Sequence, residues 1–153
     1  MKKVLLFLPL AFLILGCQTT DPQYSSLEIQ AFQSQQFDCE KKVGFASVVS
    51  VFQDYGYIIA SADLDTGLVS ANSPTDGGLV LFVGNVMKTQ KATAFIETFG
   101  GKTKIRLNFV DATESSSGYG MKSQNDKPIT DPQFYTDIFS KIGDAIFIRQ
   151  NTE

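Results

Sequence analysis

The sequence predicts an α+β protein, a two-layer sandwich in which an antiparallel sheet of about five strands carries two helices on one face. Three observations support this class. Short segments rich in β-branched and aromatic residues cluster in the middle of the chain, separated by turn-forming Asp and Gly residues. One amphipathic stretch precedes this cluster, and a second follows it. Strands grouped between two helices are typical of an antiparallel sheet that is covered on one side.

The first helix is predicted between Asp38 and Gly56, after a weak strand over residues 33–37. Asp38 is a candidate N-cap, and Glu40 lies in the first turn, where the helix dipole favours a negative charge. Apolar residues then recur at spacings of three and four as far as Tyr55. Gly56 suits the left-handed position that commonly ends a helix.

Two hairpins are predicted after this helix. Residues 57–62 and 68–72 flank an Asp-rich turn, and residues 93–99 and 104–110 flank a Gly-Gly turn. The last of these strands alternates between polar and apolar residues, as a half-buried strand does. We therefore expect a more polar, open face on the sheet, formed by Glu97, Lys104, Arg106 and Asn108.

The segment 79–87 has no clear secondary-structure signal. Its continuous apolar run fits a buried strand, a short helix or an apolar loop, because periodicity cannot separate these for a short run. A core element is favoured, and an exposed contact patch is the alternative. Tyr119 follows a flexible Ser-rich loop and begins a segment that holds one weak edge strand. The candidate interaction surface therefore comprises Leu79, Leu81, Phe82 and Tyr119.

The second helix is predicted to begin at Thr130-Asp131-Pro132, where a capping residue is followed by proline at the first helical position. Apolar residues then repeat at three and four residues from Phe134 to Ile148. This spacing gives a wide apolar stripe along one side of a helix.

The first 16 residues have the order of a secretory signal. Lys2 and Lys3 precede an apolar run of 12 residues, Val4–Leu15, which is shorter than the ~20 residues that span a bilayer. The following Gly16-Cys17 completes a sequence that resembles the lipobox of bacterial lipoproteins. The resemblance implies cleavage between Gly16 and Cys17, a diacylglyceryl group on the Cys17 thiol, and palmitate on the new amino terminus. A plain signal peptide with a cysteine by chance is the alternative.

The mature chain would be anchored to a membrane by lipid. Gln18 after the lipidated cysteine implies the outer membrane, facing the periplasm, where the enterobacterial sorting rule applies. From Cys17 onwards the chain has 11 basic and 16 acidic residues, which argues against nucleic acid as a partner. The chain divides into a signal peptide (1–16), the lipidated cysteine with a flexible tether (17–34), one α+β domain (35–149) and a tail (150–153).

The sequence contains few groups that could carry chemistry. It has no histidine, and Cys39 is the only thiol left once Cys17 is lipidated, so neither a Cys–His pair nor an internal disulfide can form. Cys39 is either a buried structural residue or a reactive thiol at a helix start. Asp63, Asp65 and Asp76 lack the spacing of a calcium loop. We therefore expect no enzymatic activity, no metal and no cofactor.

Two stretches resemble a family of small bacterial envelope lipoproteins of unassigned function. They are a Gln53-Asp54-Tyr55-Gly56 helix end followed by an Asp-x-x-x-Gly turn, and the Asp131-Pro132 helix start. The resemblance covers about residues 35–148. The order of elements is also similar to the helix-grip domains of the outer-membrane assembly lipoprotein BamC.

The resemblance implies a fold and a compartment but no activity. The lipobox, the flexible tether, the compact domain and the missing catalytic groups lead us to expect a non-enzymatic, lipid-anchored envelope lipoprotein that binds a protein partner or supports envelope assembly. The alternative is a carrier of a lipid or small hydrophobic ligand between sheet and helix. The carrier function requires an empty cavity between the sheet and a helix, whereas the partner-binding function does not.

Overall fold

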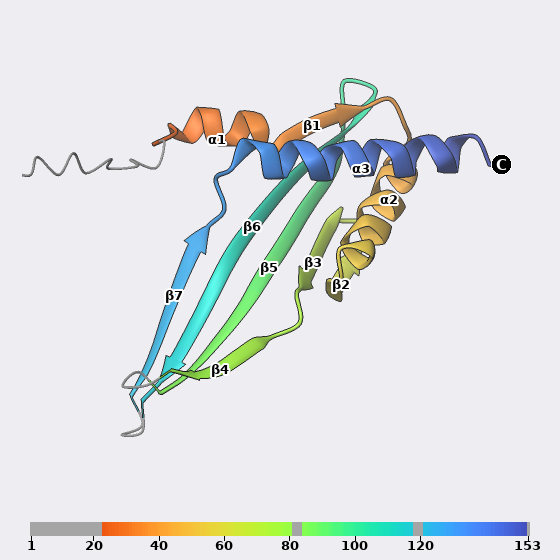
Figure 1. The fold of residues 1–153 in the computed structure, drawn as a ribbon. Helices are drawn as coiled ribbons and strands as arrows, with labels where there is room; N and C mark the ends of the chain where they lie inside the picture. The colour runs from red at the N-terminus through yellow and green to blue at the C-terminus, as the bar shows by residue number, and fades with distance from the viewer. Residues whose placement is uncertain (1–22, 81–83, 118–120, 153) are drawn as a thin grey trace, which may run out of the picture.

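The structure, a computed structural model, describes residues 23–80, 84–117 and 121–152. Within them the protein is α+β, with one antiparallel sheet of seven strands and three helices (Figure 1). The predictions made for Gly16, Cys17, Leu81, Phe82 and Tyr119 lie outside these residues. The elements are α1 (Ser26–Phe32), β1 (Ser34–Phe37), α2 (Lys41–Asp54), β2 (Ile58–Asp63), β3 (Leu68–Asn72), β4 (Asp76–Val80), β5 (Gly84–Phe99), β6 (Lys102–Ser116), β7 (Lys122–Pro128) and α3 (Pro132–Gln150).

A long hairpin of β5 and β6 runs through the whole sheet. The two strands pair from Asn85 and Ser116 to Phe99 and Lys102, a length of about 50 Å. At the turn end, β1 flanks β6, and β3 and then β2 flank β5, which gives the order β1-β6-β5-β3-β2. At the other end, β7 replaces β1 and β4 replaces β3.

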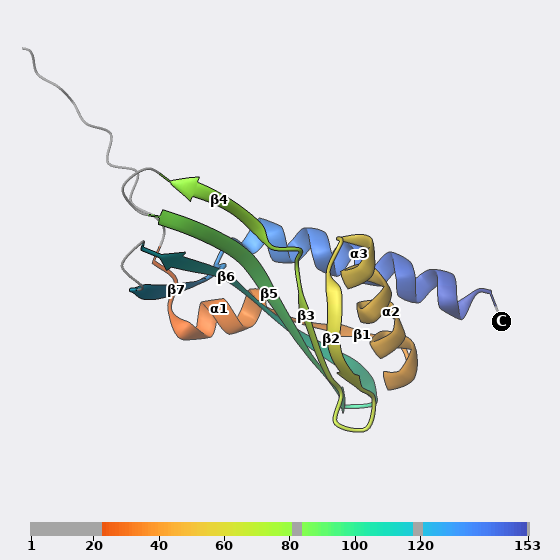
Figure 2. The ribbon, with the colours of Figure 1, turned by 90° about the horizontal axis from the view of Figure 1, so that it is seen from below.

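We call these two parts the core sheet and the arm. The arm consists of β4, β7 and the parts of β5 and β6 that pair with them, 84–88 and 110–116. It extends away from α2 and α3 (Figures 1 and 2). The prediction of about five strands fits the core sheet and falls short of the seven strands of the whole sheet. The strand β7 lies within the segment that was predicted to hold one weak edge strand. The arm strands give weak signals because they pack no face on a core and so lack the apolar alternation that marks a half-buried strand.

The helices α2 and α3 pack on one face of the core sheet, as predicted. Alternate residues of β5 and β6 point toward them, because successive side chains of a strand face opposite sides. The buried side chains of the sheet include Ala92, Ala94, Ile96, Ile105, Leu107 and Phe109, and those of the helices include Val48, Val51, Phe52, Tyr135, Ile138 and Ile142.

Aromatic rings fill the centre of this core. The ring of Phe109, fully buried on β6, lies 4.9 Å from that of Phe134, 5.7 Å from that of Tyr135 and 5.9 Å from that of Phe52, measured between centroids. The Tyr57 ring lies 6.1 Å away. These separations are those of favourable aromatic pairs. Phe109 therefore joins both helices to the sheet.

The structure corrects the boundary between tether and domain, which was predicted at residue 35. The helix α1 lies inside the predicted tether, with a capping box between Ser25 and Glu28. Its last residue, Phe32, packs its ring 5.3 Å from that of Tyr135, and Gln33 is buried. The helix itself buries no residue, so it has no apolar stripe in the sequence. The domain thus begins near Tyr24.

The two predicted helix starts differ in outcome. The Asp131 side chain accepts a hydrogen bond from the backbone N–H of Gln133 at 2.9 Å, so the predicted cap of α3 is confirmed. The prediction for α2 is wrong, because the residue before its first turn is Glu40 and not Asp38. Glu40 makes no side-chain capping bond. The end of α2 is as predicted, with Gly56 at φ +81°.

The turn between β2 and β3 fastens this hairpin to β5. The Asp63 carboxylate accepts a hydrogen bond from the N–H of Asp65 at 2.9 Å. The Asp63 carbonyl accepts a second hydrogen bond from the N–H of Gly67, also at 2.9 Å. Gly67 has φ +76°, and its carbonyl accepts from the N–H of Ile96 at 2.8 Å. The turn chemistry predicted for Asp and Gly is therefore present, and it adds a tertiary contact.

The Tyr135→Phe variant is expected to lose about 1–3 kcal/mol of unfolding free energy. The buried Tyr135 hydroxyl accepts from Gln33 Nε2 at 3.2 Å and from the N–H of Phe109 at 3.3 Å, and it donates to the Ile129 carbonyl at 3.0 Å. Removal of the hydroxyl leaves these buried groups without a partner. Urea unfolding monitored by circular dichroism measures the loss. Equal stability in Tyr135→Phe and the exposed control Tyr55→Phe would contradict this role.

Candidate functional site

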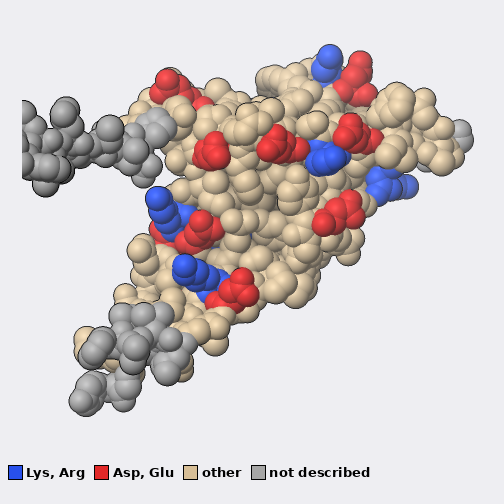
Figure 3. All heavy atoms as spheres, viewed as in Figure 1, with Lys and Arg blue, Asp and Glu red and all other residues tan. Residues whose placement is uncertain are grey.

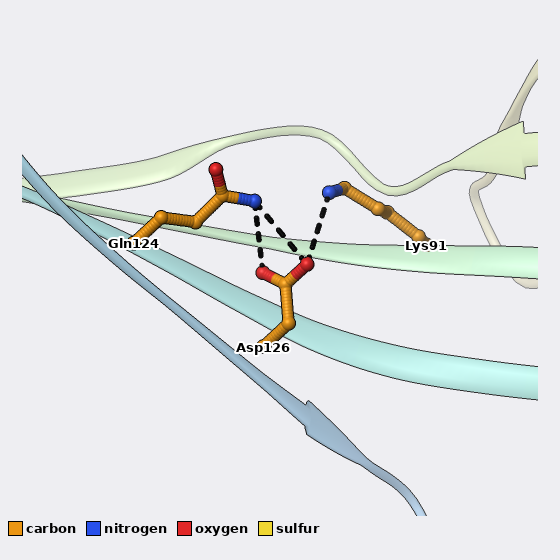
Figure 4. A network of polar contacts seen from close by, with 3 residues as sticks. All are labelled: Lys91, Gln124 and Asp126. Atoms are coloured by element: carbon orange, nitrogen blue, oxygen red, sulfur yellow. Dashed lines mark hydrogen bonds and ion pairs between the residues drawn. The ribbon is translucent and has the colours of Figure 1, made fainter.

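The arm exposes polar side chains on both faces. All seven residues of β7 are exposed. In the part of β6 that belongs to the arm, Ala112 is buried. On the face away from the helices, Lys91 Nζ lies 3.6 Å from Asp126 Oδ2, and Gln124 Nε2 donates to Asp126 Oδ1 at 3.0 Å (Figure 4). Such exposed pairs contribute about 0–1 kcal/mol. The arm therefore offers a large polar surface that the core does not require.

Two adjoining hollows lie where the arm meets the helices, and both include Asp111 and Lys127. One hollow, of about 440 Å³, lies between Tyr24 and the stretch from Lys127 to Pro132. The other, of about 420 Å³, lies over the base of the arm and is lined by Ser73, Lys88 and other polar residues. The hollows thus combine carboxylate, ammonium, amide and hydroxyl groups. These groups suit hydrogen bonds to a polar ligand or peptide.

A short chain of hydrogen bonds supports this region. The Tyr57 hydroxyl donates to Gln90 Oε1, and Gln90 Nε2 donates to Asp111 Oδ1 at 2.8 Å. The backbone of Gln90 is held by Ser73 through two bonds of 2.8 Å. Burial, with the nearby Asp111 charge, raises the pKa of Tyr57 to about 12. The hydroxyl is therefore a fixed donor at neutral pH and not a proton shuttle.

The free energy of unfolding is expected to fall as the pH rises from 10 to 12. The raised pKa of Tyr57, about 12 against an ordinary 10, means that the folded state holds the proton more tightly. This contribution is complete below pH 10 and is lost as the pH passes the folded pKa, an effect of roughly 1–3 kcal/mol. Urea unfolding across this range measures it. The Tyr57→Phe variant should show a shallower decline, and parallel curves for both proteins would contradict the assignment.

Of the candidate interaction residues, Leu79 is the one whose backbone the structure describes. It lies in β4 and pairs with Asn85, at the end of the arm far from the helices. The segment 79–87 is thus neither a helix nor one strand, because its described parts belong to β4 and β5. Met87, which ends the segment predicted as a possible contact patch, is exposed in the arm region. Met121 is exposed there as well, although the sequence did not indicate it, because a methionine among polar neighbours is a weak signal.

The face of the core sheet away from the helices is less polar than predicted. Lys104 and Glu97 lie there, with Nζ and Oε1 3.6 Å apart, but Phe95, Phe99 and Leu68 are also exposed. Leu68 pairs with Phe95, and the Lys104 ammonium lies 5.3 Å from the centre of the Phe99 ring. Phe99 thus has a charged neighbour, whereas Leu68 and Phe95 form an exposed apolar pair.

The structure favours the structural alternative for Cys39. Its thiol is half-buried, and burial raises the pKa of Cys39 above its usual range. Thr103 Oγ1 donates to the Cys39 carbonyl at 2.6 Å, which fixes the backbone here. Cys39 precedes the Glu40 cap, so it does not lie in the first turn of α2. Among the described residues, no three His, Cys, Asp or Glu side chains gather in a group that could hold a metal ion.

The comparisons with known proteins give no assignment. No family model matches the chain, and no curated protein matches it. Of the helices in the described part of the chain, none has both the length and the apolar character needed to cross a membrane.

Proposed function

We propose that this chain is a lipid-anchored lipoprotein of the bacterial cell envelope that acts without catalysis, as an adapter for a protein partner. Cys17 carries the lipid and holds the domain at the outer membrane, facing the periplasm. The arm binds the partner or supports envelope assembly. The sequence at Gly16-Cys17 motivates the anchor, and the exposed arm is the observation that carries the binding role.

The arm is suited to recognition for two physical reasons. Ordering its residues costs conformational entropy, yet it buries little apolar surface in return. Because the core does not depend on the arm residues for its packing, their side chains are available to contact a partner. In addition, β4 and β7 each pair on one side in the described sheet, so each has a second edge of backbone groups that a partner strand can join.

The charge distribution favours a protein over an anionic surface. On the face shown in Figure 3, acidic and basic side chains lie together over the arm and form no extended patch of one sign. An anionic lipid or a nucleic acid is bound through clustered Lys and Arg. Mixed charges and amides instead suit the polar surface of another protein.

The carrier function receives less support from the packing. It needs space between the sheet and the helices, where Phe52, Phe109 and Tyr135 are at most 1% exposed and in ring contact. Native mass spectrometry of the delipidated protein, refolded with envelope lipids, tests this alternative. A stoichiometric lipid adduct would support the carrier over the adapter.

Photocrosslinking in cells tests the adapter. A photoreactive amino acid replaces Asn125 on the arm in one variant and Asp144 on the exposed side of α3 in a matched control. We expect one dominant crosslinked protein from position 125, at several times the yield from position 144. Expression of the Cys17→Ala chain should reduce that yield, because the domain is no longer held at the membrane. Equal, weak crosslinking from both positions would refute the adapter function.

A further inference from the structure

The tether is much shorter than the sequence predicted. Because α1 belongs to the domain, the stretch between Cys17 and the domain ends at Tyr24 and not at residue 34. The seven steps from Cys17 to Tyr24 can span at most ~25 Å. A tether ending at residue 34 would reach ~60 Å. The docking of α1 therefore sets how far the domain stands from its lipid.

Three contacts hold the end of α1 in place. The Phe32 ring lies 5.3 Å from that of Tyr135, and Gln33 Nε2 donates to the Tyr135 hydroxyl at 3.2 Å. The Gln33 carbonyl accepts from the N–H of Leu107 at 2.8 Å. Two of these contacts involve the same side chain, the fully buried Tyr135 of the main core. The start of the domain is thus fixed to α3 and β6.

The chain enters the domain beside the arm. Tyr24 lines the hollow of about 440 Å³ together with the end of β7 and the start of α3. The other end of α3 lies about 28 Å away along its axis, on the opposite side of the molecule (Figure 1). The tether thus brings the base of the arm, and not the far end of α3, close to the membrane.

We propose that the arm binds the water-exposed polar part of a protein embedded in the same membrane as the lipid anchor. This inference rests on the proposed lipid anchor and adapter function. The short tether confines the arm to a layer next to the bilayer, where a neighbouring membrane protein is at high effective concentration. The mixed charges and amides of the arm fit such a polar protein surface, and on the face shown in Figure 3 they form no basic patch that would fit an anionic one.

The placement is tested with the lipidated full chain in phosphatidylethanolamine and phosphatidylglycerol vesicles that carry an acceptor dye on some headgroups. In a Cys39→Ser background, a donor dye is attached through Lys127→Cys at the arm base or Asn151→Cys at the end of α3. We expect several-fold more efficient energy transfer from position 127. Insertion of a Gly/Ser segment of about 20 residues after Pro22 should remove most of the difference. Equal transfer from both positions with the native tether would overturn the placement.

The partner class is tested by identifying the protein crosslinked from position 125 in cells. We expect a protein that is integral to the membrane holding the anchor, and a several-fold lower yield after the Gly/Ser insertion. A soluble partner, or one integral to another membrane, would overturn this inference and leave the adapter function standing. Crosslinking to lipid alone would overturn it as well. The absence of any preferred crosslink from the arm would instead refute the adapter function itself.

Discussion

The Gly67→Ala variant is expected to lose about 4 kcal/mol of unfolding free energy, from backbone strain together with the loss of a hydrogen bond to β5. Gly67 has φ +76°, where an L side chain is strained by ~1–2 kcal/mol. A Cβ would also lie 1.9 Å from the Ile96 carbonyl oxygen, far inside contact distance. The turn must therefore move away from β5 and break its hydrogen bond with Ile96. Urea unfolding of the full domain measures this loss.

The matched control is Gly56→Ala. Gly56 has φ +81°, but a Cβ there meets no atom within 4 Å. This variant therefore carries the backbone strain without the clash, and it should lose only ~1–2 kcal/mol. The difference between the two variants isolates the close approach of the turn to β5. Equal losses of unfolding free energy in the two variants would show that the turn does not lie close to β5, or that it moves away at little cost.

The second large effect is expected at Phe109, where the change to alanine should cost about 3–5 kcal/mol. The side chain is fully buried, and its ring lies against rings from α2, from α3 and from Tyr57, just before β2. Truncation leaves a cavity at the point where both helices meet the sheet. Thermal and urea unfolding should both show the loss, together with weaker near-ultraviolet circular dichroism from the aromatic cluster.

Phe99→Ala is the control for this prediction. Phe99 lies on the same hairpin, but its side chain is 56% exposed and contacts Lys104 on the open face. Its truncation should cost less than ~1 kcal/mol. A Phe109→Ala loss of similar size would mean that the cluster is loosely packed.

The parts of the fold that the sequence predicted are those that pack on the core. The alternation of Ile105, Leu107 and Phe109 identified a half-buried strand, and Asp131-Pro132 identified the start of α3. Both signals arise because one side of an element faces apolar neighbours and the other faces water. Where that contrast is present, a single sequence carries enough information to place the element.

The arm and α1 lack this contrast. The residues of β7 are exposed on both faces, and α1 buries none of its residues, so neither has an apolar period. The end of α1 is held through Gln33 by Tyr135, which is distant in sequence, and β7 is held by backbone pairing with the preceding strand β6. Sequence reasoning therefore assigned α1 to a flexible tether and reduced β7 to a weak edge strand.

The candidate site was only partly predictable for the same reason. The apolar run predicted Leu79 as an interaction residue, and the structure places its backbone at the far end of the arm. The polar hollows at its base were missed, because Tyr57, Gln90 and Asp111 come from three separate parts of the chain. The residues that flank such polar side chains in the sequence do not indicate that the fold places them next to one another.

The uninterrupted β5–β6 hairpin also has a mechanical consequence. Both strands pass from the core sheet into the arm without a loop, and their pairing register continues across the junction. A sheet bends much less easily than a loop, so the arm behaves as a stiff lever with its fulcrum in the aromatic core. A force applied to its tip would therefore tilt the whole domain instead of being absorbed at a joint. In the proposed adapter, this stiffness would let the domain transmit the movement of a partner as well as hold it.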